Sequence, residues 1–209
     1  MKIIFLDFDG VLNTEAWQRH CMAHGLPTED GFGPVFDPEA IANLKAIVDA
    51  VPDIGIVITS SWKWEGEEKM KQLWQERGLP GHLAGIAPDY IPDLDDNAID
   101  EILRGKRPVV RGADIRYWQE LNNATECPYV IFDDIPDFFP EHQAHFIQTD
   151  PHVGITRENA KTTIDLFNRY VILSAAPSDD TRAIQVDPAK GLTRKDVELA
   201  LELLNYADK

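Results

Sequence analysis

Side chains that bind metal ions and phosphate groups follow three apolar segments of this 209-residue sequence. Asp7 and Asp9 close the first segment, two positions apart, and therefore lie on the same side of an extended chain. Thr59 and Ser60 close the second segment, and the third ends in acids. Several carboxylates at one place repel one another unless a cation lies among them, and hard oxygen ligands suit Mg²⁺. A magnesium ion held by carboxylates in turn suits a phosphorylated substrate.

The acids after the third segment are Asp133 and Asp134, with Asp137 shortly after them. Any one of these acids, taken alone, could shape a turn or cap a helix, because Asp is common in turns. Buried strands have no reason to end in clustered, unpaired carboxylates, so the three segments together favour a shared site. In open parallel sheets ligands bind beyond the carboxyl ends of the strands, which would bring these side chains together.

Alternating strands and helices must position these side chains. Near-continuous apolar runs are typical of strands in a buried parallel sheet, and they occur at residues 2–8, 54–59, 129–133 and 145–149. Helical spacing of apolar residues, with capping residues and prolines at the ends, predicts helices at residues 38–51, 65–77 and 112–122. This alternation predicts an α/β fold with a mainly parallel sheet. Residues 13–36 and 83–108 are expected to be mainly loop.

The C-terminal part of the sequence contains a duplication. Residues 147–168, IQTDPHVGITRENAKTTIDLFN, recur at residues 184–205 as IQVDPAKGLTRKDVELALELLN. Each copy predicts a strand, a turn at DPxxG and a helix that begins at a threonine N-cap. We interpret residues 170–209 as a linker and an added strand–turn–helix unit that packs on the core or on a partner subunit, as in a homodimer. The core then spans residues 1–169.

The charge balance limits the kinds of partner. The chain carries 20 Lys and Arg against 36 Asp and Glu, a formal net charge of −16. Broad nucleic-acid binding and binding to an anionic membrane both depend on cations, so both are disfavoured, although a local basic site is compatible with this charge. The sequence contains no run of 18 apolar residues and no signal-peptide pattern, and its two cysteines, Cys21 and Cys127, lack zinc-ligand spacing. We therefore expect a cytoplasmic protein with ordinary thiols.

The ordered motifs resemble those of the haloacid dehalogenase-like (HAD) phosphatase superfamily. The matching residues are DFDGVL at residues 7–12, Thr59, Arg111-Gly112 and Asp133-Asp134 with Asp137. SSW followed by a basic residue, RGxxIxxW, VIxDD and TDPxxGxT are more closely similar to the small HAD-like domain associated with Swiss-army-knife RNA repair proteins. This resemblance extends to about residue 169 and does not include the second copy of the duplication. It implies a Rossmann-like three-layer αβα core.

The resemblance also implies a two-step phosphatase mechanism. Asp7 would attack phosphorus and form an aspartyl-phosphate. Asp9 would protonate the leaving oxygen and later take a proton from the attacking water. Thr59 and the amide after it would hold the phosphoryl oxygens, and Arg111 would neutralise the charge that develops during transfer.

Metal and substrate contacts complete the implied site. Mg²⁺ would be bound by Asp7, the backbone carbonyl of Asp9 and Asp134, with Asp133 as a further ligand or an orienting group. The expected substrate contacts are Gly10, Ser60 and Lys63.

Two assignments stay open. Ser60 competes with Thr59 for the hydroxyl of the second motif, and we favour Thr59 because it directly ends the apolar run. Lys106 or Arg107 could serve in place of Arg111 as the basic residue.

The gaps in which HAD-like enzymes carry cap insertions are short here, so we expect an open site with at most a small lid at residues 13–36. An open site suits a large substrate such as a nucleic-acid end or a phosphoprotein, whereas the net charge of −16 argues against nucleic acid, which leaves the substrate class open. Trp62 and Trp64 either stack on a ring of the substrate or, as we prefer, pack under the loop. The predicted function is a Mg²⁺-dependent phosphomonoester hydrolase, and the alternative is a non-catalytic HAD-like binding or assembly module that uses its C-terminal unit.

Overall fold

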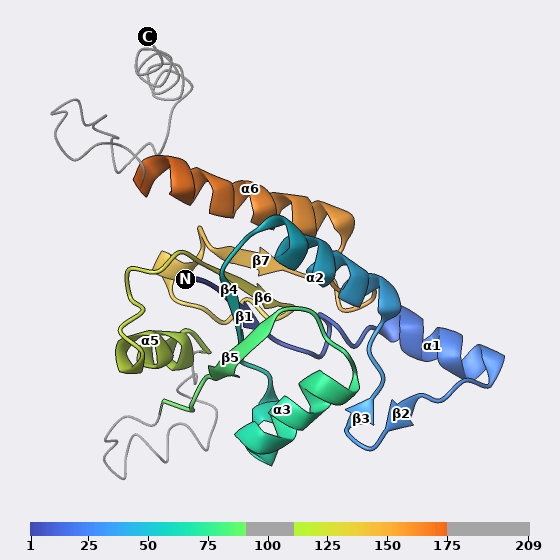
Figure 1. Cartoon of the computed structure of the whole chain (residues 1–209). Helices are drawn as coiled ribbons and strands as arrows, with labels where there is room; N and C mark the ends of the chain where they lie inside the picture. The colour runs from blue at the N-terminus through green and yellow to red at the C-terminus, as the bar shows by residue number, and fades with distance from the viewer. Residues whose placement is uncertain (91–110, 175–209) are drawn as a thin grey trace, which may run out of the picture. The chain divides into compact units, whose positions relative to one another are not determined.

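A five-stranded parallel sheet organises the chain, which the computed structural model describes at residues 1–90 and 111–174 (Figure 1). The strand order is β5-β4-β1-β6-β7, and every neighbouring pair is parallel. The strands are β1 (Lys2–Leu6), β4 (Ile54–Ile58), β5 (His82–Ile86), β6 (Tyr129–Asp133) and β7 (Phe146–Gln148). Because β1 lies in the middle, the chain extends the sheet first on one side of β1 and then on the other.

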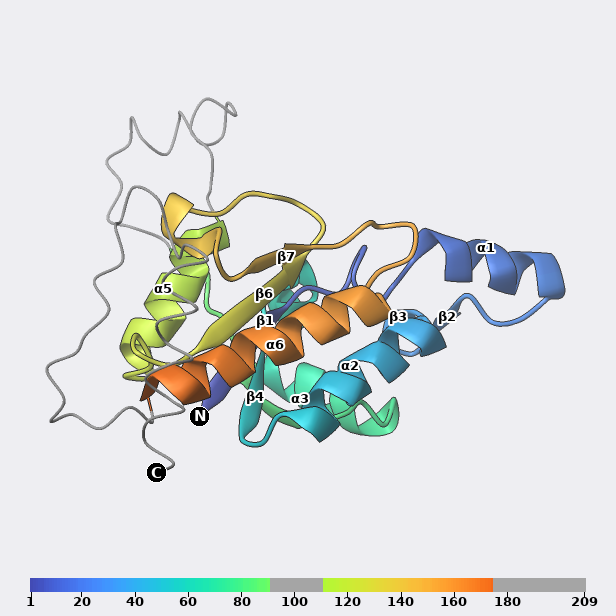
Figure 2. The same ribbon diagram turned by 90° about the horizontal axis from the view of Figure 1, so that it is seen from above.

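Helices cover both faces of this sheet, which confirms the prediction of a three-layer α/β fold. One face holds α2 (Pro38–Ala50), α3 (Glu67–Glu76) and α6 (Arg157–Ser174), and the other holds α5 (Arg111–Leu121). Figure 2 shows α2 and α6 lying next to each other. Within residues 1–90 and 111–174, no helix combines the length and the apolar character needed to cross a membrane.

Two apolar cores separate the layers, because alternate side chains of a strand point to opposite faces of the sheet. On one face, Leu6 belongs to the same buried cluster as Leu44 of α2 and Phe167 of α6. On the other face, Phe5 packs edge-on against Trp118 of α5, with 5.6 Å between the ring centroids. Strands buried on both faces explain the near-continuous apolar runs in the sequence.

Capping residues set the helix ends as the sequence predicts. The Asp37 side chain accepts a hydrogen bond from the Glu39 N–H at the start of α2. Thr156 Oγ1 accepts one from the Asn159 N–H (3.2 Å) at the start of α6, as expected for the first copy of the duplicated unit. Gly78, with a φ of 59°, follows the last turn of α3, where a left-handed residue ends a helix.

The segment at residues 13–36, expected to be loop, contains regular structure. It forms helix α1 (Glu15–His24) and a hairpin of strands β2 (Glu29–Asp30) and β3 (Gly33–Pro34). Helix α1 buries only Cys21, so it lacks the apolar stripe by which a helix is recognised in a sequence. Its start is marked instead by Thr14, whose hydroxyl accepts a hydrogen bond from the Trp17 N–H.

Strand β5 is a second departure, because residues 83–108 were expected to be mainly loop and β5 occupies residues 82–86. Its pairing with β4 is interrupted by a register shift between Ile56 and Val57. Gly85 has a φ of 148°, and a Cβ there would lie 3.7 Å from the Trp118 Nε1. A short segment that contains such a glycine shows no clear strand pattern.

The first copy of the duplicated unit forms β7 and α6, joined by a turn at residues 150–154. The second copy at residues 184–205 lies outside the described residues, as do Lys106 and Arg107. Residues Met1–Val171 form one compact unit. The interpretation of residues 170–209 as a linker and an added unit stays a prediction.

Gly154, in the turn between β7 and α6, is required by a close backbone approach. Its φ is 65°, and a Cβ there would lie 2.3 Å from the Val11 carbonyl oxygen. Gly25 has a similar φ of 67°, but no atom lies within 4 Å of such a Cβ. We expect Gly25→Ala to lower the free energy of unfolding by about 1 kcal/mol, the cost of a left-handed alanine, and Gly154→Ala by about 3 kcal/mol, because the clash adds to that cost. Equilibrium urea unfolding measures both losses, and equal losses would contradict the close approach.

Candidate active site

Strand register places Asp7, Thr59 and Asp133 side by side at the carboxyl end of the sheet. Leu6 of β1 is level with the last residue of β4 and with Phe132 of β6. The Thr59 N–H donates to the Leu6 carbonyl (2.9 Å), and the Asp7 N–H donates to the Phe132 carbonyl (3.0 Å), so this register continues by one residue. The predicted convergence of three strand ends is therefore present in the fold, at the edge where open parallel sheets bind ligands.

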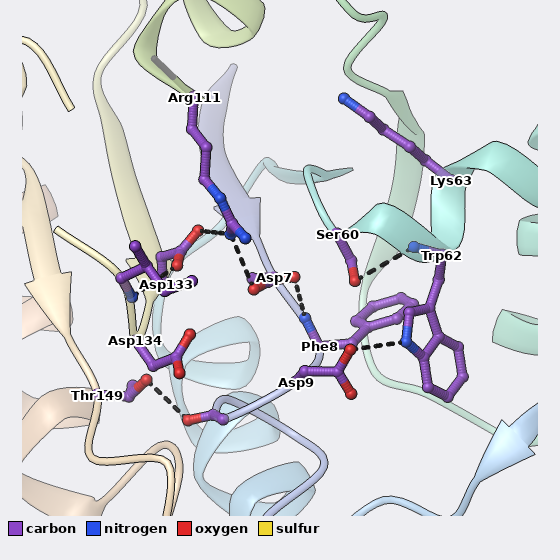
Figure 3. Close-up of polar contacts among 12 residues, drawn as sticks. Asp7, Phe8, Asp9, Ser60, Trp62, Lys63, Arg111, Asp133, Asp134 and Thr149 are labelled. Carbon is purple, nitrogen blue, oxygen red and sulfur yellow. Dashed lines mark hydrogen bonds and ion pairs between the residues drawn. The ribbon is translucent and has the colours of Figure 1, made fainter. Parts of the chain in front are cut away.

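Asp7 is a buried carboxylate with a hydrogen-bond donor on each oxygen. Asp7 as a whole residue is 3% exposed. The Phe8 N–H donates to Asp7 Oδ1 (2.8 Å), and Arg111 Nη1 donates to Asp7 Oδ2 (3.0 Å) (Figure 3). Each oxygen keeps a further lone pair, so the carboxylate retains acceptor sites for a ligand.

Arg111, the first residue of α5, bridges two acids. Its Nη1 donates to Asp133 Oδ2 as well as to Asp7 Oδ2. Burial acts to lower the pKa of Arg111, but the charges of Asp133 and Asp7 outweigh it and raise that pKa above its ordinary value. The next residue, Gly112, has no room for a side chain, because a Cβ there would lie 2.8 Å from the His142 ring. The close contact between α5 and His142 holds the first turn of the helix beside the acids.

Asp133 and Asp134 complete a group of three carboxylates with Asp7. Burial and the charge of Asp7 raise the pKa of Asp133 to about 7, despite the neighbouring Arg111, and they also raise the pKa of Asp134. One oxygen from each of the three residues lies within 4.8 Å of the others. The donor set is the hard, anionic one that Mg²⁺ takes, and a divalent cation would relieve the repulsion that raises these pKa values. The residues therefore fit the expected metal ion.

The absence of a side chain at Gly10 leaves room for the Asp134 carboxylate. Its φ is 71°, and a Cβ there would lie 2.7 Å from the Asp134 carboxylate. Thr149 Oγ1, at the end of β7, donates to the Gly10 carbonyl (2.8 Å) and fixes the loop after β1. The predicted role of Gly10 in substrate binding stays a prediction, whereas its fit against Asp134 is a structural reason for a glycine.

The Asp9 side chain points away from the three carboxylates and is exposed (Figure 3). Trp62 Nε1 donates to its Oδ2 (2.9 Å), and Asn13 Nδ2 donates to its Oδ1 (2.8 Å). The role of the Asp9 side chain in proton transfer stays a prediction, and the expected metal contact concerns only the backbone carbonyl of Asp9.

The two candidate hydroxyls of the second motif have different environments. Ser60 Oγ accepts a hydrogen bond from the Trp62 N–H (3.5 Å) and caps the short 3₁₀ helix η1 (Ser61–Glu65). Thr59 Oγ1 is buried and has no hydrogen-bond partner among the described residues. The Thr59 hydroxyl is thus the one that a ligand could still engage.

Lys63 does not join the carboxylate group, although the sequence predicts a phosphate contact for it. Its side chain is 5% exposed, and its Nζ lies 2.8 Å from Asp89 Oδ1 and 2.8 Å from Asp114 Oδ2. Figure 3 shows the ammonium well apart from the Asp7 carboxylate. The buried ion pair with Asp114 ties η1 to α5. Among the described residues, Asp137 also stays outside the group.

Three residues near the site were not predicted as site residues. Thr149 tethers the Gly10 carbonyl, and Asn13 and Trp62 hold the Asp9 carboxylate. The signal for Thr149 is its position directly after a strand, one residue beyond the register partner of Asp133, whose carbonyl accepts from the Thr149 N–H. Trp62 packs against Phe8 and Phe36, as the preferred interpretation expects, but the same interpretation is wrong for Trp64, which is 73% exposed. The sequence contains no signal that the Trp62 indole N–H would reach Asp9.

The shifted pKa of Asp133 predicts a pH-dependent stability. The pKa is about 7 in the folded chain and near 3.8 ordinarily, so between these pH values the folded, metal-free protein binds more protons than the unfolded chain. Its free energy of unfolding therefore falls as the pH rises through this interval. We expect Asp133→Asn to flatten this fall, measured as urea midpoints from pH 4.5 to 7.5 in the presence of a chelator, roughly the window that linkage defines. An unchanged pH slope in Asp133→Asn would contradict the assignment.

Comparisons with known proteins identify the family to which the chain is similar. The model of a family described as the HAD domain in Swiss Army Knife RNA repair proteins matches residues 3–160, which contain every residue of the site. No curated protein matches the sequence. A solved structure of a Legionella pneumophila protein, assigned to subfamily III A of the HAD superfamily hydrolases, is 12% identical and covers 80% of this chain and 84% of that chain, with a TM-score of 0.36.

Proposed function

We propose that this chain, which belongs to the family of HAD domains in Swiss Army Knife RNA repair proteins, is a Mg²⁺-dependent phosphomonoester hydrolase. Its family and its fold are those of a HAD-type hydrolase. The observation that carries the proposal is the row of Asp7, Thr59 and Asp133 at the carboxyl ends of neighbouring strands, with Arg111 donating to both acids. This arrangement combines a buried carboxylate nucleophile, a fixed cation and a hydroxyl that has no hydrogen-bond partner within the described part of the chain.

In the proposed first step, Asp7 is the nucleophile. A carboxylate oxygen of Asp7 forms a bond to phosphorus while the bond from phosphorus to the leaving oxygen breaks. The Phe8 N–H and Arg111, which donate to Asp7, orient its carboxylate. The product of this step is an aspartyl-phosphate and an alcohol.

Asp9 transfers the protons in both proposed steps. Its carboxyl group gives a proton to the leaving oxygen in the first step, and its carboxylate takes a proton from the water that attacks the aspartyl-phosphate in the second. The second step releases phosphate and restores Asp7. Asp9 is exposed and fixed by Trp62 and Asn13, which supports a position at the mouth of the site, where the leaving group and water enter.

Arg111 and Thr59 are the proposed partners of the phosphoryl oxygens. Donors that are already in place stabilise the charge that develops on these oxygens during transfer. Asp7, Asp134 and Asp133 would hold Mg²⁺ through their carboxylates, together with the Asp9 backbone carbonyl. The bound ion would supply positive charge next to the phosphoryl group.

The family's link to RNA repair proteins makes a terminal RNA phosphate one substrate to test. The segment at residues 13–36 holds only α1 and the β2–β3 hairpin and is too short for a large cap domain, which supports access for a large substrate. The formal net charge of −16 opposes extended contact with RNA, because such contact depends on cations. A phosphopeptide is the alternative substrate to test beside the RNA phosphate.

The nucleophile is tested by the loss of turnover in Asp7→Asn. We expect wild type to hydrolyse an aryl phosphate only with Mg²⁺, and Asp7→Asn to lose at least about 10³-fold in kcat, because an amide cannot form the covalent intermediate. Asp137→Asn is the matched control, since Asp137 follows the same strand as Asp133 but lies outside the carboxylate group.

Retained activity in Asp7→Asn would contradict the mechanism. An inactive wild type would contradict the proposed function and favour the alternative, a non-catalytic module that binds a partner.

The metal site is tested by Mg²⁺ titration in a calorimeter. We expect Asp134→Asn to weaken Mg²⁺ binding at least about tenfold, because it removes one of three clustered carboxylates, and Asp137→Asn to leave it unchanged. Binding by wild type should tighten as the pH rises through about 7, because the metal must displace the proton of Asp133. Equal affinities of wild type and Asp134→Asn would remove Asp134 from the metal site.

A further inference from the structure

Trp62 lies beside the Asp9 carboxylate and, with it, lines a cavity for which the proposed reaction steps give no role. Its Nε1–H donates to Asp9 Oδ2 (2.9 Å), and its ring packs edge-on against Phe8, with 5.5 Å between centroids. Gly33 of the β2–β3 hairpin approaches the same ring, because a Cβ there would lie 3.3 Å from it. The indole is thus held in a fixed position beside Asp9 (Figure 3).

The cavity on this side of Asp9 is lined mainly by aromatic and other apolar side chains. It has a volume of about 360 Å³ and borders Asp9 itself. Phe32, Trp62 and Trp64 contribute aromatic side chains to its wall, and Met70 contributes a thioether. A space of this size, open to solvent and bordered by rings, can hold a planar group.

Trp64 is the exposed part of this wall. It is 73% exposed, although its indole N–H is fixed by a hydrogen bond to Asp89 Oδ2 (2.9 Å). Apart from Asp9, the charged side chains that line the cavity are Glu65 and Lys69, which pair with each other at 2.8 Å. Away from Asp9, the wall therefore offers a ligand an oriented aromatic side chain, and aromatic side chains bind planar rings by stacking.

We propose that this cavity binds the leaving group of the phosphate ester and selects a leaving group with a planar aromatic ring. The inference rests on the proposed function. In that reaction Asp9 protonates the leaving oxygen, so this oxygen must lie within hydrogen-bond distance of Asp9. The rest of the leaving group must then extend into a space that also borders Asp9, and the aromatic cavity is such a space.

A second cavity, of about 550 Å³, also borders Asp9 and serves as the structural control. Its lining includes Asn13, Arg19 and Asp134, and none of the described residues that line it is aromatic. Because it includes Asp134, it lies on the metal side of the site. A leaving group that entered this second cavity would not meet Trp64.

The test compares two phosphate esters that differ only in the leaving group, 2-naphthyl phosphate and ethyl phosphate, by phosphate release. The measured quantity is the ratio of kcat/KM for the two esters. Trp64→Ala should lower the ratio about tenfold, which is the size of one stacking contact. Trp64→Phe should keep the ratio near that of wild type, because it retains a ring while losing the hydrogen bond to Asp89. Arg19→Ala, on the surface of the second cavity, should leave the ratio unchanged.

Two outcomes would overturn the proposal: an unchanged ratio in Trp64→Ala, or a ratio that falls in Arg19→Ala instead. If wild type hydrolyses neither ester, the proposed function fails. The cavity is then tested separately, by the binding of phosphonates that cannot be hydrolysed. Naphthalen-2-ylphosphonate and methylphosphonate are then titrated calorimetrically in the presence of Mg²⁺. Tighter binding of the naphthyl compound that is lost in Trp64→Ala supports the cavity, and equal or absent binding of the two compounds refutes it.

Discussion

The repulsion between buried carboxylates is the constraint on which this structure depends. Asp7 directly follows β1 and Asp133 ends the neighbouring parallel strand β6, so the strand register itself forces the two acids together. Burial and mutual repulsion raise the pKa of Asp133 to about 7. Arg111 is the cation that the described chain supplies against this repulsion, with a single nitrogen donating to both acids. Because Arg111 offsets part of this negative charge, removing Arg111 would leave the buried acids without their cation partner.

Supporting contacts hold this charged group from both sides. On the helix side, Gly112 lets the first turn of α5 rest against His142, and Lys63 ties the same helix to η1 through Asp114. On the loop side, Thr149 anchors the Gly10 carbonyl, and the turn at Gly154 packs against the loop after β1. The first copy of the duplicated unit therefore does more than extend the sheet: it fixes the loop that carries Asp9.

The parts of the fold that are governed by burial and capping were predictable from the sequence. The strands on both sides of β1 are apolar runs, and Asp37, Thr156 and Gly78 mark helix ends by their chemistry. Helix α1 and strand β5 were not predictable, because α1 buries a single side chain and β5 is short and contains Gly85. At the site, the strand-end residues were foreseeable from the topology of parallel sheets. The pairing of Lys63 with two acids and the bond from Trp62 to Asp9 depend on side-chain directions that sequence spacing does not specify.

Covalent capture of the phosphoryl group tests the central claim, that Asp7 is a nucleophile placed by strand register, most directly. Wild type and Asp9→Asn are mixed with an aryl phosphate whose leaving group departs without a proton, quenched in acid, and analysed by intact mass and peptide mapping. The account predicts an added phosphoryl group on Asp7, which accumulates in Asp9→Asn because the attack of water lacks its base. A phosphoryl group on another residue, or turnover without any covalent species in either protein, would contradict it.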